Sequence, residues 1–223
     1  SQTPVDSVFE LVNETSVSAT ITGLLPNTTY YYRLSANNSA GSTNGSEFSF
    51  TTTTAPSKPA GSGTALSPYL LTNIDELVWL MSSDTTWDDV FALANDIDAS
   101  GSADLEDGAG FSPVGNSAIP FSGQFNGRGN LITGLTINRD SENDIGFFGV
   151  VSNGVIDSLG LTAVDILGNS QVGSLAGMVT GNSTVEMCYS SGYVEGANDI
   201  GGLVGLLQGS SFLRDCYASN RVK

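Results

Sequence analysis

The chain has 223 residues, with 23 acidic residues, 7 basic residues and no histidine, for a formal net charge of −16. This charge repels nucleic acid and anionic membrane surfaces, and no apolar run approaches the roughly 18 residues that cross a bilayer. The lack of histidine removes the usual general base and the commonest transition-metal ligand. The composition therefore predicts no nucleic-acid partner, no membrane insertion and none of the common hydrolase activities.

The composition is also typical of an extracellular or cell-surface protein, because it is rich in Ser, Thr, Asn and Gly and poor in Lys. Several asparagines stand in Asn-X-Ser/Thr sequons, the acceptor pattern for N-glycosylation. They are Asn13, Asn27, Asn37, Asn44 and Asn182. We expect an extracellular or surface location, with these asparagines as candidate glycosylation sites.

The first stretch with a clear periodicity is residues 16–54. Apolar side chains alternate with polar ones at 17–21, 30–36 and 48–50, and the turn sequence "NSAG" separates the last two runs. Alternation over short runs is typical of half-buried strands. The sequence thus predicts three antiparallel strands, each with one buried face.

The segment "LLPNTTYYY" has the spacing Leu24, Pro26, Thr28 and Tyr30. This spacing resembles the tyrosine corner of fibronectin type III domains, which are sandwiches of about 7 strands. The resemblance covers only the C-terminal half of such a domain, and it implies a partial fibronectin type III-like sandwich at residues 1–54. Two explanations for the missing strands stay open: the chain is cut from a longer one, or a neighbouring subunit supplies them.

A segment rich in Thr, Pro, Ser and Gly predicts a linker at 55–64, followed by a second domain at 65–223. This domain begins with apolar residues at near-helical spacing, preceded by Thr72 and Asp75 in capping-box positions. The apolar residues are Ile74, Leu77, Val78, Leu80 and Met81. We expect a short helix that caps the open end of a stacked array.

Two later stretches repeat one another. "QVGSLAGMVTGNSTVEMCYSS" at 171–191 matches "DIGGLVGLLQGSSFLRDCYAS" at 199–219 with an offset of 28 residues, and "IGFFG" at 145–149 begins a diverged copy. Repeats of this length are typical of solenoids, whose units bury their apolar faces only by stacking. The sequence therefore predicts an all-β fold: a partial sandwich, a capping helix and a parallel β-helix. Glycines are expected at corners that need φ > 0 or a close approach of coils.

A family resemblance rests on these repeats. "GSLAG" and "GGLVG", each followed by a "CY" pair, resemble the GLUG motif of secreted adhesin-like proteins of bacteria and archaea. "FALANDIDAS", "FSPVGNS", "FSGQFNGRGNLITGLTIN" and "IGFFG" are similar to segments that precede those repeats in the same families. The resemblance covers 67–223. It implies a surface protein with a β-helical stalk, and it implies no catalytic site.

The two cysteines, Cys188 and Cys216, occupy equivalent positions of the repeat. Stacked strands lie about 4.8 Å apart, within the range of Cα separations that a disulfide spans. The pair can therefore form a disulfide between coils. The alternative is a ladder of two reduced thiols, because Cys packs as a small hydrophobe.

The segment "DIDASGSADLED", residues 96–107, has the spacing of a calcium loop of about twelve residues, with Gly101 at the sharp turn. The candidate ligands are Asp96, Asp98, Ser100, Asp104 and Asp107. The alternative is a solvated acidic loop, since residues 75–107 contain ten acidic residues and no basic one. Calcium is the only cofactor that the sequence suggests.

Carboxylates on neighbouring coils, such as Asp157 and Glu186, have the proximity that glycosidases use, but no sequence feature builds a cleft around them. We therefore expect no enzyme. The favoured function is that of an extracellular structural or adhesive surface protein: an adhesin stalk segment, or a filament subunit assembled by strand complementation and coil stacking. Its partners would be further copies of itself, or cell-surface polysaccharide or protein. The alternative is a non-catalytic polysaccharide-binding module, whose exposed aromatics would stack on sugars.

Overall fold

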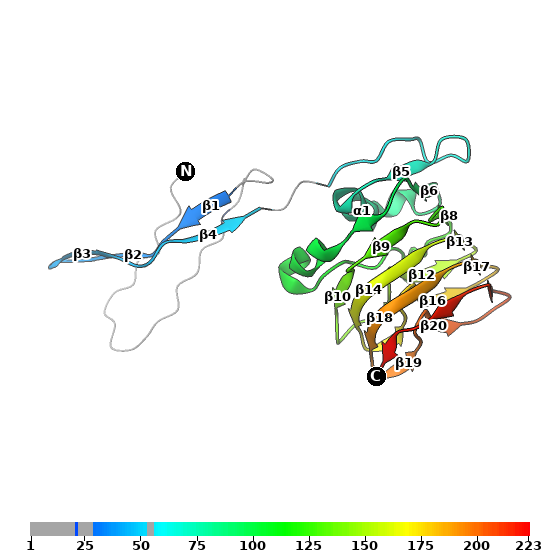
Figure 1. The fold of residues 1–223 in the computed structure, drawn as a ribbon. Helices are drawn as coiled ribbons and strands as arrows, with labels where there is room; N and C mark the ends of the chain where they lie inside the picture. The colour runs from blue at the N-terminus through cyan, green and yellow to red at the C-terminus, as the bar shows by residue number, and fades with distance from the viewer. Residues whose placement is uncertain (1–20, 22–28, 53–55) are drawn as a thin grey trace. The chain divides into compact units, whose positions relative to one another are not determined.

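The computed structural model describes residues 21, 29–52 and 56–223 (Figure 1). The chain divides into two compact units, Ser1–Ala55 and Pro56–Lys223. Each unit is described by itself below.

The described part of the first unit is an antiparallel hairpin. Its strands are β1 (Thr29–Tyr32), β2 (Ser35–Asn38), β3 (Gly41–Asn44) and β4 (Phe48–Thr51). β1 pairs with β4 and β2 with β3, so the paired strands run on either side of the predicted turn. The Asn38 side-chain oxygen accepts hydrogen bonds from the backbone N–H groups of Ala40 (2.9 Å) and Gly41 (3.1 Å), which closes the turn. The predicted second and third strands and their turn are thus confirmed, whereas their predicted buried face is wrong for the described hairpin, because Tyr32 and Phe48 are 51% and 58% exposed.

Aromatic side chains line one face of this hairpin. The rings of Tyr30 and Phe50 lie 5.9 Å apart and those of Tyr32 and Phe48 lie 5.7 Å apart, at cross-strand positions. The predicted strand at 17–21, apart from Ile21, and the tyrosine-corner residues at 24, 26 and 28 lie outside the described residues. The fibronectin type III-like sandwich therefore stays a prediction.

The second unit is a parallel β-solenoid, as predicted. Its helical segments are α1 (Ile74–Met81) and the 3₁₀ segments η1 (Asp84–Thr86) and η2 (Ser100–Gly108). Its strands are β5 (Tyr69–Leu71), β6 (Val90–Leu93), β7 (Ile97–Asp98), β8 (Gln124–Asn126), β9 (Leu131–Thr133), β10 (Thr136–Asn138), β11 (Asn143–Ile145), β12 (Phe148–Ser152), β13 (Val155–Asp157), β14 (Gly160–Leu167), β15 (Ser170–Val172), β16 (Ala176–Thr180), β17 (Thr184–Glu186), β18 (Tyr189–Glu195), β19 (Asn198–Ile200), β20 (Val204–Leu207), β21 (Phe212–Arg214), β22 (Tyr217–Ala218) and β23 (Arg221–Val222).

These strands form stacked parallel ladders, one strand from each successive coil (Figure 1). One ladder runs β5-β6-β8-β13-β17-β21, a second runs β7-β9-β14-β18-β22, and two shorter ones run β11-β15-β19 and β12-β16-β20. Val185 pairs with Leu213 and Tyr189 with Tyr217, each 28 residues further along the chain. The sequence repeat is therefore the stacking repeat of the coils.

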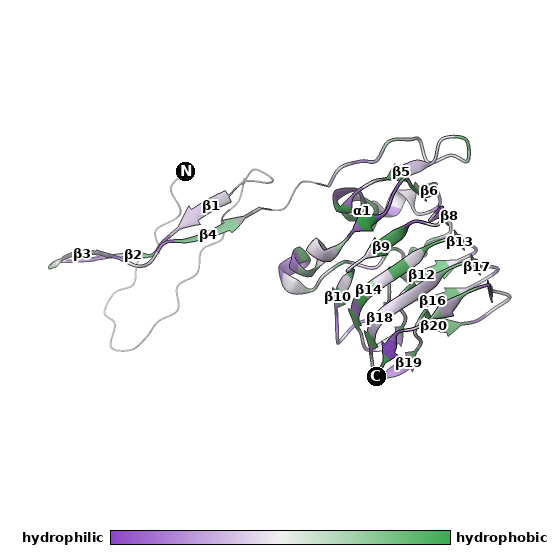
Figure 2. Cartoon of the chain, viewed as in Figure 1, coloured by the Kyte–Doolittle hydropathy of each residue, from purple (hydrophilic) through white to green (hydrophobic). Residues whose placement is uncertain are grey.

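The solenoid strands carry both hydrophobic and polar residues (Figure 2), and the buried hydrophobic set forms the core. Ile156 and Val185 are fully buried and stack directly, one above the other. The earlier coils fill the same space with aromatic rings, and the ring centroids of Phe147 and Phe148 lie 4.9 Å apart. Aliphatic side chains in the C-terminal coils and phenylalanines in the earlier coils thus form one continuous core.

The predicted helix is confirmed as α1, which lies beside β5 and β6 (Figure 1). The predicted capping box is wrong by one residue, because the helix is capped by Asn73 rather than by Thr72. The Asn73 side chain accepts from the Glu76 N–H at 3.1 Å, and the Glu76 carboxylate accepts from the Thr72 N–H and hydroxyl. Glu76 stands three residues after the cap, the acid position of a capping box, but its carboxylate reaches Thr72, the residue before the cap, rather than the Asn73 N–H.

Most of the segment predicted as a linker packs on the second unit. The Leu70 N–H donates to the Ala60 carbonyl at 2.8 Å, which pairs this segment with β5. The Lys58 ammonium lies 5.2 Å from the centre of the Tyr69 ring, within the range of a cation–π contact. The second unit therefore begins near residue 56 rather than at 65.

The glycines of the "GSLAG" and "GGLVG" motifs mark places where coils approach closely. A Cβ atom on Gly177 would lie 2.3 Å from the Asp144 carbonyl carbon and 2.5 Å from the Ile145 nitrogen. On Gly205, one coil later, it would lie 2.5 Å from the Val172 nitrogen. Of the two reasons expected for corner glycines, close approach explains these two.

Candidate functional site

The residues predicted to bind calcium lie around η2, where most of the loop is helical rather than wrapped around a centre. An Asp96 carboxylate oxygen accepts from the Leu131 N–H at 2.9 Å. An Asp98 oxygen accepts from the Ser100 N–H at 2.9 Å, and this hydrogen bond lowers the pKa of Asp98. No group of three or more Asp, Glu, His or Cys side chains that could hold a metal occurs within 29–52 and 56–223. The structure thus does not gather the ligand set, including Asp104 and Asp107.

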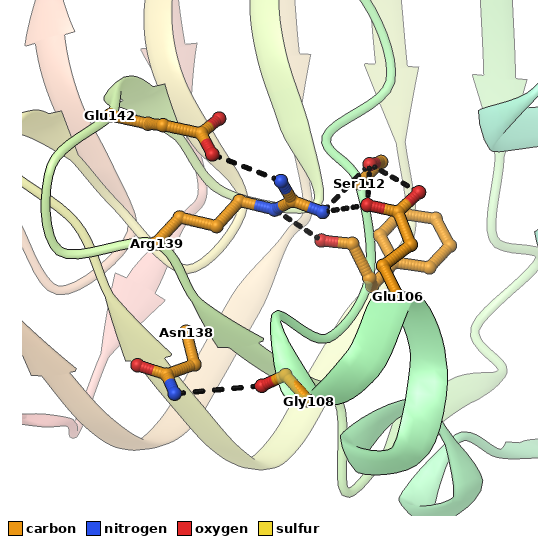
Figure 3. A network of polar contacts seen from close by, with 7 residues as sticks. Glu106, Gly108, Ser112, Asn138, Arg139 and Glu142 are labelled. Atoms are coloured by element: carbon orange, nitrogen blue, oxygen red, sulfur yellow. Dashed lines mark hydrogen bonds and ion pairs between the residues drawn. The ribbon is translucent and has the colours of Figure 1, made fainter. Parts of the chain in front are cut away.

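A polar network that the sequence analysis did not identify fixes the end of this loop (Figure 3). The Arg139 guanidinium pairs with Glu106, and it also pairs with Glu142 at 3.1 Å. It donates to the Ser112 hydroxyl at 2.8 Å and to the Phe111 carbonyl at 3.4 Å. The Arg139 side chain is only 10% exposed, whereas those of Glu106 and Glu142 are 44% and 55% exposed, so the network is buried on the arginine side only. The network ties η2 to the segment between β10 and β11. The only sequence signal for it was an isolated base downstream of an acidic segment.

A cleft of about 570 Å³ lies beside this network. Its lining includes Asn116, Ser117 and Asn143 together with Arg139 and Asp144. Burial raises the pKa of the Asp144 carboxyl. The cleft therefore offers a mixture of amide, hydroxyl and carboxylate groups to a ligand.

The carboxylates of Asp157 and Glu186 lie on neighbouring coils, at paired positions of β13 and β17. The Asn126 amide donates to Asp157 at 3.1 Å and the Ser158 hydroxyl donates to it at 2.9 Å. Glu186 forms an ion pair with Arg214. Each carboxylate therefore has its own structural partners on the outside of the solenoid.

The two cysteines are free thiols at stacked positions. Each donates to the carbonyl two residues before it: Cys188 to Glu186 at 3.1 Å and Cys216 to Arg214 at 3.2 Å. Cys188 is fully buried, and this burial raises the pKa of its thiol to about 12. The arrangement is that of the thiol ladder, and a disulfide between the two coils stays a prediction.

Three of the candidate glycosylation sites lie in the described residues. Asn37 and Asn44 are exposed on β2 and β3, and Asn182 is exposed at the turn before β17. Asn13 and Asn27 lie outside the described residues. All three described sites are thus open to modification.

The last coil presents a face that the earlier coils do not. We call this the C-terminal face, formed by β19, β20, β21, β22 and β23, the outermost strands of their ladders. Val179 and Val194 are fully buried, whereas their stacking partners Leu207 and Val222 are 44% and 45% exposed. Tyr217, stacked on Tyr189 with ring centres 5.0 Å apart, is 62% exposed. This face therefore combines unpaired strand edges with half-covered apolar side chains.

The fold and this face define the second unit as a stacked parallel β-solenoid. No family model matches the chain, and no solved structure matches it. The chain is 35% identical over 141 residues to halomucin of Haloquadratum walsbyi, an alignment that covers 62% of the chain and 2% of halomucin. It is 36% identical over 127 residues to a putative Gly-rich membrane protein of Evansella cellulosilytica, covering 55% of the chain and 14% of that protein. The chain thus spans a small part of either relative.

Within the described residues, no helix has the length and apolar character needed to cross a bilayer.

Proposed function

We propose that the chain is a segment of an extracellular or cell-surface structural protein, in which the β-solenoid acts as a stalk. The names of the two relatives, a halomucin and a Gly-rich membrane protein, fit a surface role. The chain covers little of either one, so this role describes the segment rather than a whole relative. The proposal includes the GLUG resemblance and an adhesive role, and it includes no catalytic activity.

One observation carries the proposal: the repeated residues serve stacking. Gly177 and Gly205 permit close approach between coils, and Cys188 and Cys216 fill equivalent rungs of the core. The acids of the repeat, such as Glu186, are held by side chains of adjacent coils. Such a body extends by adding coils, and this is the behaviour of a stalk or scaffold.

The proposal also includes the first unit as an assembly element. The hairpin carries an aromatic row, and Phe48 is 58% exposed on it. In a fibronectin type III-like sandwich this row would face a second sheet. Strands from a neighbouring subunit or from the parent chain would complete that sandwich.

Electron microscopy of the native protein, with the mass determined on the same preparation, tests the stalk role. We expect elongated particles or filaments. Deletion of residues 1–54 should leave the solenoid folded, because the two units are separate, and should abolish lateral or end-to-end assembly. Compact globular particles in the native preparation would contradict the stalk, and assembly that survives the deletion would contradict the role of the hairpin.

The cleft beside Arg139 favours a second candidate function, non-catalytic binding of polysaccharide. Carboxylate and amide groups such as those of Asp144 and Asn116 are suited to hydrogen bonding with sugar hydroxyls. Binding of neutral oligosaccharides, measured by calorimetry, should be lost in Asp144→Asn with Asn116→Ala. Equal binding by the parent and this variant, or no binding by the parent, would contradict the polysaccharide-binding function.

A further inference from the structure

We propose that the C-terminal face binds a parallel β-coil that carries carboxylates opposite Arg214 and Lys223. The inference rests on the proposed stalk function and specifies the chemistry of the coil that extends the stalk. It concerns which side chains the occupant must carry, not only that strands can be added.

Charged residues follow a consistent order along the outer ladders of the solenoid. One ladder reads Asn126, Asp157, Glu186 and Arg214, one residue from each successive coil. A second ends with Glu195 followed by Lys223, next to the paired residues Val194 and Val222. In both ladders the base appears only in the last coil. Arg214, Arg221 and Lys223 are three of the seven basic residues of the chain.

Each of these two bases is bound on one side and open on the other. Arg214 forms an ion pair with Glu186, and the Lys223 ammonium lies 2.7 Å from a Glu195 oxygen. The acids beneath are 23% and 29% exposed, whereas Arg214 and Lys223 are 59% and 64% exposed. A guanidinium has five N–H donors and an ammonium has three, so both bases keep donors for a further carboxylate. In each ladder the glutamate is thus mostly covered by the last coil, whereas the base above it is mostly exposed.

The distance between coils determines which charge an added coil can carry opposite Arg214 and Lys223. Paired positions on neighbouring strands lie about 5 Å apart, and like charges directly opposite one another are destabilising. A base over Arg214 or Lys223 would repel it, whereas a carboxylate would form an ion pair with it. The last coil has two acids: Asp199 accepts from the Gln171 amide of the preceding coil at 3.0 Å, and the Asp215 charge acts on Arg214 in addition to the ion pair that Arg214 forms with Glu186. The same argument disfavours two copies meeting through identical basic faces.

The apolar part of the face fits the same occupant. Leu207, Leu213 and Val222 stack on residues that the last coil covers completely: Val179, Val185 and Val194. A coil with aliphatic side chains at these three rungs would continue the core. The occupant is therefore a repeat of the same kind as residues 168–195, with acids where that coil has Glu186 and Glu195.

The test extends the full chain by one coil, a copy of residues 168–195 placed directly after Lys223. The 28-residue offset sets the two copied glutamates opposite Arg214 and Lys223. Three versions are compared by thermal melting at low and high salt: with both glutamates, with both replaced by glutamine, and with both replaced by lysine. We expect the melting temperature to fall in that order, and the differences to shrink at high salt.

A double-mutant cycle completes the test. The difference in melting temperature between the glutamate and lysine versions should shrink when Arg214 and Lys223 are both replaced by glutamine, whereas Arg128→Gln, at an exposed base outside this face, should leave that difference unchanged. Equal melting of the three versions, or a difference that Arg214→Gln with Lys223→Gln leaves unchanged, would overturn the proposal. The stalk function is tested separately by microscopy and would survive these failures.

Discussion

Replacement of Gly177 by alanine tests whether close approach of coils explains the glycines of the repeat. The new methyl group would lie 2.3 Å from the Asp144 carbonyl carbon and 2.5 Å from the Ile145 nitrogen, where nonbonded carbon contacts require about 3.5 Å. The obstructing atoms belong to the backbone, so a side-chain rotation cannot relieve the contact. The coil must instead move.

The expected cost follows from this geometry. Overpacking typically costs about 1–3 kcal/mol, and we expect about 3 kcal/mol for Gly177→Ala because backbone has to shift. For a unit of this size each kcal/mol lowers the melting temperature by roughly 2–4 °C, so the melting temperature should fall by roughly 6–12 °C. Far-UV circular dichroism or calorimetry measures the shift.

Gly101→Ala is the matched control, because its Cβ would meet only the Ile74 Cδ1 atom at an ordinary 3.5 Å. We expect it to be neutral or to stabilise the protein by up to about 1 kcal/mol through the unfolded state. If Gly177→Ala prevents folding, Gly205→Ala on the outermost coil provides a milder version of the same contact. Parent-like melting of Gly177→Ala would refute the close-approach explanation.

Three further predictions concern the core, the thiols and the polar network. Ile156→Ala should lower the free energy of unfolding by about 2–5 kcal/mol in urea titrations, whereas Val155→Ala, at an outward position 38% exposed, should change it little. Native Cys188 should resist alkylation at pH 8 while Cys216 reacts, as mass spectrometry of the labelled protein would show. The Cys188 thiol titrates near 9 when unfolded and at about 12 when folded, so its stabilisation should persist below pH 9 and decline as pH rises toward 12. Arg139→Ala should cost about 1–2 kcal/mol, discounted because its carboxylate partners are half exposed, and Arg139→Lys should recover only part of this.

Much of the solenoid could be predicted from the sequence, because its interactions repeat in register with the chain. An offset of 28 residues places Val185 beneath Leu213 and Tyr189 beneath Tyr217, so the repeat alone predicts these contacts. The helix at 74–81 could be predicted from its apolar spacing, whereas its cap could not be fixed to one residue. Thr72 and Asn73 are both good caps, and only the structure shows that the Asn73 side chain accepts from the Glu76 N–H while the Thr72 hydroxyl donates to the Glu76 carboxylate.

The Arg139 network could not be predicted in the same way. Arg139 and Glu106 lie 33 residues apart, and their contact depends on how η2 ends against the β10–β11 connection rather than on a repeat. The calcium hypothesis failed to find support for a related reason. Spacing places oxygens at alternating positions, but an Asp96 oxygen accepts from the Leu131 N–H, 35 residues away in the chain, and an Asp98 oxygen accepts from the Ser100 N–H. The first contact depends on how coils stack, which a local pattern of residues does not show.

The two ends of the solenoid differ in how far their strand edges are covered. At the N-terminal end the outer side of β5 is paired with Ala60, and β12 is bridged by Val114 and Phe121. At the other end, β19 to β23 are outermost in their ladders and carry half-exposed apolar side chains. A head-to-tail stack of identical units needs a free strand edge at both ends, and here the N-terminal edge is in part already covered. The strand edges of the described solenoid are therefore more open at the C-terminal face than at the N-terminal end. The proposed filament, if it forms between copies, would have to use the hairpin of the first unit, and its assembly should be independent of Arg214 and Lys223.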